Sequence, residues 1–175
     1  MTSLALHERL QHDVDNGQVM DGDRRYVLLR ADVLMGIFEG LPENTAQEAL
    51  TAFRDSVNRH GSASVRAYER GADPDPEQLL ATVASGAASL GWGRWHVELD
   101  DTTCRLRVFN SPFAQARDGH GKACAAIVGM LSAVCSHIWR KPVLAREVRC
   151  AACETHACSP EAGICTFEAT FQPST

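Results

Sequence analysis

The chain has 175 residues, of which 45% are hydrophobic and 22% charged, and its formal net charge is −5. This length and composition are typical of one globular domain with its own core, and the negative charge argues against nonspecific binding to nucleic acid. No stretch approaches the roughly 20 apolar residues of a membrane span, and the N-terminus shows no apolar signal segment. The seven cysteines then indicate a reducing compartment, so we expect the protein in the cytoplasm.

The first half of the chain is expected to be mainly helical. Apolar spacing and turn residues predict one strand, at 24–29, and four helices, at 2–14, 32–42, 45–57 and 76–91. We expect the helix that starts at residue 45 to break over 58–63, where Gly61 lies, before a helical pattern resumes.

The second half changes to strand patterns. Apolar and polar residues alternate over 93–99 and again over 104–108, and Asp100 lies in the turn between them. This pattern predicts a β-hairpin with one buried and one solvated face. A helix over 123–139 and two strands, at 142–148 and 165–171, complete the prediction. Helices early and strands late indicate an α+β fold with an antiparallel sheet packed against helices.

Possible metal ligands are concentrated near the C-terminus. Cys150 and Cys153 have CxxC spacing, and four further candidates lie close in sequence: Glu147, His156, Cys158 and Cys165. Zinc takes thiolate, imidazole and carboxylate ligands in a tetrahedron. Buried core thiols are the alternative, and Cys165 fits that reading because Phe167 and Phe171 lie on the same strand face. Four cysteines within 16 residues favour a metal site.

A fifth cysteine, Cys124, is a further candidate because of its place on the helix predicted over 123–139. It lies in the first turn, on the face that also carries Ile127 and Leu131, so it is expected to point inward. A helix N-terminus favours thiolate over thiol, although spacing alone allows a buried core thiol equally well. Cys104 and Cys135 are expected to be core residues.

Several short motifs together resemble the 4-vinyl reductase domain family, over residues 22–172. They are Gly91-Trp92-Gly93-Arg94-Trp95, Asn110-Ser111-Pro112-Phe113, Cys124 with Gly129, Glu147-x-x-Cys150, and Cys165-Thr166-Phe167. The family is similar to the aromatic-sensing domains of phenol- and xylene-responsive activators, and it includes a bacteriochlorophyll biosynthesis accessory protein. The resemblance implies an α+β ligand-binding domain over 22–175, after an N-terminal helix and arm over 1–21, and it implies a homodimer.

The resemblance also implies a zinc ion held by three cysteines and one glutamate. The matching positions are Cys124, Glu147 and Cys150. The fourth ligand is either Cys158, by distance from Cys150, or Cys165, by its place at the start of the last strand. Glu147 and Cys150 would face opposite sides of a regular strand, so the strand must end or bulge before Cys150. The insertion that carries Cys153 and His156 departs from the family pattern.

A small-molecule pocket is expected between the helices and the inner face of the sheet. The residues predicted to line it are Trp92, Trp95, Phe109, Phe113, Val128 and Leu131. There is no phosphate-binding glycine loop, no catalytic triad order, no HExxH motif and no dinucleotide fingerprint in the sequence. The sequence therefore favours binding over catalysis.

The favoured function is a stand-alone, zinc-containing domain that binds a small hydrophobic or aromatic molecule. Such a domain would act in sensing, through a separate signalling protein, or as an accessory factor. One alternative is a reductase or accessory protein that acts on a tetrapyrrole. Another is an iron–sulfur or metal-sensing protein, because the extra cysteines could hold a cluster.

Overall fold

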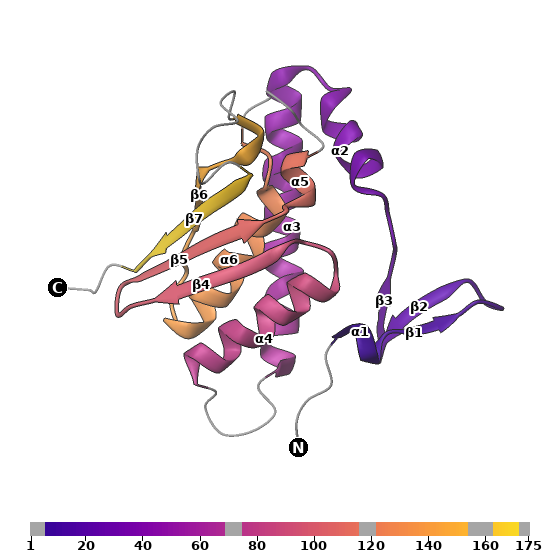
Figure 1. Ribbon diagram of the computed structural model, residues 1–175, viewed down its shortest axis with the longest axis horizontal. Helices are drawn as coiled ribbons and strands as arrows, with labels where there is room; N and C mark the ends of the chain where they lie inside the picture. Colours follow the sequence, from indigo (N-terminus) through magenta and orange to yellow (C-terminus); the bar gives the residue numbers. More distant parts are fainter. Residues whose placement is uncertain (1–5, 69–74, 116–121, 154–162, 172–175) are drawn as a thin grey trace.

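The computed structural model describes residues 6–68, 75–115, 122–153 and 163–171 (Figure 1). Its elements in chain order are α1 (Leu6–Arg9), β1 (Gln11–Asp13), β2 (Gln18–Asp21), β3 (Arg24–Tyr26), α2 (Ala31–Glu39), α3 (Glu43–Tyr68), α4 (Pro76–Ser89), β4 (Arg94–Leu99), β5 (Thr103–Phe109), α5 (Pro112–Gln115), α6 (Ala125–Ile138), β6 (Arg146–Arg149), the 3-10 helix η1 (Ala151–Cys153) and β7 (Ile164–Thr170). The predicted α+β class is confirmed.

The main sheet has four antiparallel strands in the order β4-β5-β7-β6. The predicted hairpin forms its first half, with Val97 opposite Leu106. Asp100 holds the turn, because its carboxylate accepts hydrogen bonds from the backbone N–H groups of Thr102, at 3.0 Å, and Thr103, at 2.7 Å. In the second half, β6 pairs with β7, and α6 contacts both strands.

The long helices α3 and α6 pack against each other behind the sheet (Figure 1). Gly129 makes this approach possible, since a Cβ atom there would lie 2.4 Å from the Arg54 carbonyl oxygen. The core between α6 and the sheet contains buried Ile127, Leu131 and Phe167. The apolar face of the sheet is thus covered by helices, and the opposite face carries charged side chains.

Two predictions about the helices are wrong. The helix starting at Glu43 runs through Gly61 without a break, and that glycine packs closely against the Met130 side chain. Of the helix predicted over 2–14, the described residues form a helix at Leu6–Arg9 and no helix over 10–14. A three-stranded sheet, β1-β2-β3, follows it instead, because Gly17 and Gly22 adopt positive φ angles that suit tight hairpin turns.

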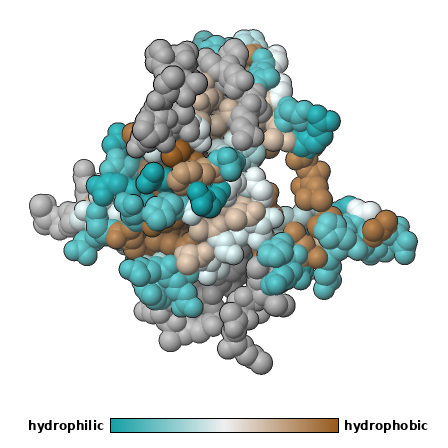
Figure 2. Space-filling model, in the orientation of Figure 1, coloured by the Kyte–Doolittle hydropathy of each residue, from teal (hydrophilic) through white to brown (hydrophobic). Residues whose placement is uncertain are grey.

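In the N-terminal arm, defined as residues 6–30, the small three-stranded sheet projects from the side of the molecule (Figure 1), whereas Leu6 on α1 is buried and α1 contacts α4. The link from this sheet to α2 is apolar and exposed: Val27, Leu28 and Leu29 are 81%, 71% and 54% accessible to solvent. Figure 2 shows this link as a brown column between the small sheet and α2. The domain boundary at residue 21 stays a prediction. In the described ranges, no helix is long and apolar enough to span a membrane.

Candidate metal centre and small-molecule cavity

Four buried side chains from three parts of the chain meet at one point. Cys124 is the residue that precedes α6, Glu147 lies on β6, Cys150 follows β6 directly, and Cys165 lies on β7. One sulfur or carboxylate oxygen from each lies within 4.8 Å of all the others, and all four residues are buried. These are three thiols and a carboxylate, a donor set that suits a tetrahedral zinc ion.

A local irregularity in β6 allows Glu147 and Cys150 to face the same point. The pairing of β6 with β7 shifts between Glu147 and Arg149, and η1 begins at Ala151. Two residues three apart on a regular strand would point to opposite faces. The expectation that the strand must bulge or end before Cys150 is confirmed.

Backbone groups already hold two of the four donors in position. The N–H of Cys124 donates a 3.1 Å hydrogen bond to Glu147 Oε2, and the N–H of Ala151 donates a 3.3 Å bond to Cys165 Sγ. The Cys124 and Cys165 sulfurs are 3.7 Å apart. The second carboxylate oxygen, Glu147 Oε1, is buried and has no hydrogen-bond partner within the described part of the chain. A buried acceptor without a partner is costly, and a metal ion would satisfy it.

The electrostatics of the four groups also fit a cation. Burial, followed by the nearby Cys150, raises the pKa of Glu147 to about 8. Hydrogen bonds from Cys124 and then Cys165 lower the pKa of Cys150 well below its ordinary value. The carboxyl and the three thiols are thus buried side by side, where their negatively charged forms would repel one another. A divalent ion would stabilise their deprotonated forms together.

Of the two candidates for the fourth ligand, the structure describes only Cys165. Cys165 belongs to the buried set, whereas Cys158 lies outside the described residues, as does His156. Cys153 is described but does not join the set: it is exposed and ends η1. The distant Cys124, which the helix pattern predicted to point inward and the family resemblance implied as a ligand, completes the set.

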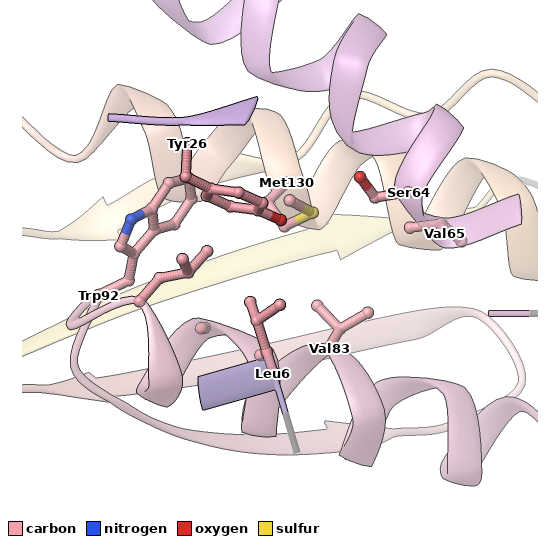
Figure 3. Close-up of a pocket in the computed structure, with 10 residues that line it drawn as sticks. Leu6, Tyr26, Ser64, Val65, Val83, Trp92 and Met130 are labelled. Carbon is pink, nitrogen blue, oxygen red and sulfur yellow. The ribbon is translucent and has the colours of Figure 1, made fainter. Parts of the chain in front are cut away.

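A separate cavity of about 60 Å³ lies where the N-terminal arm meets α3, α4 and α6 (Figure 3). Its walls are mostly apolar, with the Ser64 hydroxyl and the Tyr26 phenol as polar groups: they comprise Leu6, Tyr26, Ser64, Val65, Val83, Gly86, Ala87, Leu90, Trp92 and Met130. Sequence reasoning missed all but Trp92. The arm residues could not be found, because no local pattern shows that Leu6 and Tyr26 return to α4.

Of the six residues predicted to line a pocket, Trp92 lines this cavity and the other five lie elsewhere. Phe113 packs edge-on against Trp92 with ring centroids 5.5 Å apart. Trp95 is buried in the core, where its indole N–H donates to the Trp92 carbonyl at 3.3 Å. Val128 and Leu131 are buried in α6. Phe109 lies beside Arg94, whose guanidinium carbon is 4.6 Å from the ring centre.

Comparison with solved structures identifies two similar folds. The phenol-responsive sensory domain of the transcription activator PoxR, solved with phenol, has a TM-score of 0.76 at 17% identity, over 94% of this chain and 86% of that one. A vinyl-4-reductase family protein from Methanocaldococcus jannaschii has a TM-score of 0.50 at 12% identity, over 80% and 89%. No family model and no curated protein matches the sequence. The expected resemblance is therefore confirmed at the level of the fold.

Proposed function

We propose that this chain is a sensory-type domain that binds a small hydrophobic or aromatic molecule in the cavity beside Trp92. The observation that carries the proposal is an apolar cavity with a few polar groups in a fold similar to a phenol-responsive domain. Small-molecule sites commonly have this character. The signal would pass to a separate protein, and the free thiols suit the cytoplasm.

The size of the cavity favours a single-ring ligand over a tetrapyrrole. Its volume of about 60 Å³ would accept only a handful of water-sized groups, at roughly 10–15 Å³ each. A phenol-sized molecule needs a small adjustment of the walls, which the flexible Met130 side chain can supply. A macrocycle would require the N-terminal arm to move away.

We further propose that zinc occupies the site formed by Cys124, Glu147, Cys150 and Cys165. A site with four protein ligands is closed to substrate, which is typical of structural zinc. The ion would join the start of α6 to β6 and β7, and its binding energy would add to the stability of the folded chain. The unpartnered Glu147 Oε1 supports this role.

A homodimer is the third part of the proposal. The three strands of the arm carry no buried residue, and so small a sheet is unstable without an apolar partner surface. The exposed Val27, Leu28 and Leu29 continue into Val33 and Ile37 on α2, which are 50% and 57% accessible. A second copy of the chain would cover this strip by pairing the same surface from both partners.

Ligand binding is tested by thermal unfolding of the purified protein with phenol, toluene and cyclohexane. We expect one or more of the aromatic compounds to raise the midpoint in a concentration-dependent way, because a ligand of the native state stabilises it. The visible spectrum separates the alternatives: a zinc protein is colourless, whereas an iron–sulfur protein is brown and a tetrapyrrole absorbs strongly. A coloured protein without response to aromatics would contradict the proposal.

A further inference from the structure

Cys153 is a thiol that the buried four-ligand site leaves unused. Of the six cysteines in the described residues, it is exposed and the other five are buried. It closes the 3-10 turn that starts at a ligand, since its N–H donates a 3.0 Å hydrogen bond to the Cys150 carbonyl. An exposed thiol thus lies one turn from a proposed metal ligand.

The turn brings the two residues within range of a disulfide. An i to i+3 turn keeps its end Cα atoms within about 7 Å, and disulfides span Cα distances of about 4.4–6.8 Å. The turn that the backbone already forms is therefore compatible with a bond between the two sulfurs. The other close pair, Cys124 and Cys165, has sulfurs 3.7 Å apart, but both residues are completely buried, so an oxidant in solution cannot reach them directly.

We propose that Cys150 and Cys153 form an oxidative modification site at which a hydroperoxide converts the two thiols into a disulfide. The Cys153 sulfur attacks the peroxide, the O–O bond breaks, an alcohol or water leaves, and a sulfenic acid forms. The Cys150 sulfur then attacks the Cys153 sulfur, the S–O bond breaks and water leaves. The thiols lose two electrons and two protons, and the hydroperoxide is reduced.

The consequence for the metal centre follows because Cys150, whose sulfur enters the disulfide, is one of the proposed ligands. A disulfide at Cys150 removes one of four donors, which leaves Cys124, Glu147 and Cys165 to hold the ion. The inference rests on the proposed metal centre, and it makes that centre release its ion under oxidation.

The test uses the full chain loaded with zinc and treated with hydrogen peroxide. Released zinc is followed with a chromophoric chelator, and disulfides are mapped by peptide mass spectrometry. We expect release to accompany a Cys150–Cys153 disulfide, and a dithiol to restore both thiols and binding. Cys153→Ser should bind zinc like the wild type and release it several-fold more slowly. Cys158→Ser, the matched control in the same segment, should release it at the wild-type rate.

Two sets of results would overturn the inference in distinguishable ways. A protein that binds no zinc by elemental analysis would contradict the metal centre itself and, with it, the release step. A zinc-loaded protein in which peroxide yields a Cys124–Cys165 or Cys158 disulfide would contradict only the assignment to Cys153. Equal zinc release rates for Cys153→Ser and the wild type would also contradict the assignment to Cys153.

Discussion

The backbone N–H of Cys124 donates a 3.1 Å hydrogen bond to Glu147 Oε2, which joins the start of α6 to strand β6. One carboxylate oxygen thereby fixes the helix end, while the other, Oε1, has no hydrogen-bond partner in the described ranges and remains for a metal. Glu147 links the fold to the proposed ion.

Replacing Glu147 should separate these two roles. The side-chain carbonyl of Glu147→Gln can still accept the bond from Cys124, but it lacks the charge that a metal prefers. For Glu147→Gln we expect weaker zinc binding and an unchanged fold without metal. For Glu147→Ala we expect to lose both zinc binding and the hydrogen bond that fixes the start of α6. Competition with a chelator measures the affinity, and circular dichroism the fold. Unchanged affinity in Glu147→Gln would remove the carboxylate from the ligand set.

The close approach of α3 and α6 predicts a sharp difference between two glycines. Gly129→Ala would place a Cβ 2.4 Å from a backbone oxygen, so the helices must separate, at a cost of about 1 to 3 kcal/mol in the free energy of unfolding. Gly61→Ala meets the flexible Met130 side chain instead, and its gain of about 1 kcal/mol in helix propensity offsets that contact. Urea unfolding measures both variants. Equal losses would contradict the packing described.

Acid should loosen the β4–β5 turn through Asp100. Hydrogen bonds, first from the Thr102 backbone, lower the pKa of this carboxyl below its ordinary value of 3.8. Because the native pKa is the lower one, the contribution to stability is present above about pH 4 and is lost as pH falls through the native pKa. Asp100→Ala should lower the thermal midpoint at pH 7 and flatten its fall in acid. A variant with the wild-type profile would exclude this role.

Filling the cavity should abolish the response to aromatic compounds. Ser64 lines the cavity, so Ser64→Leu places apolar volume where we propose that a ligand binds. Ala63→Leu, on the exposed side of the same helix, serves as the control. We expect the thermal shift with phenol to disappear in the first variant and to persist in the second. A persistent shift in Ser64→Leu would place the ligand elsewhere.

A charge in the exposed apolar strip should dissociate the proposed dimer. Leu28→Glu would bury a carboxylate in that interface, whereas Leu144→Glu alters an equally exposed leucine outside the strip. Light scattering after size exclusion gives the mass of each variant. We expect a monomer for Leu28→Glu and a dimer for the wild type and for Leu144→Glu. A monomeric wild type would contradict the proposal.

Local patterns predicted the parts of the fold that local forces determine. The alternation around Asp100 predicted the hairpin, because its faces differ in burial. The family resemblance, rather than a local pattern, predicted Cys124, Glu147 and Cys150, which are three of the four buried donors. Gly61 was misleading, since packing against Met130 outweighs the local cost of glycine in a helix. The cavity could not be predicted, because Tyr26 reaches it through the path of the N-terminal arm.

The most direct test of the metal centre is the metal content of the purified protein and of two single variants. The proposed ligand set predicts one zinc per chain in the wild type, retention of zinc in Cys158→Ser, and its loss in Cys165→Ser. Cys165 belongs to the buried cluster with Cys124, Glu147 and Cys150. Zinc lost from Cys158→Ser but kept in Cys165→Ser would contradict this ligand set.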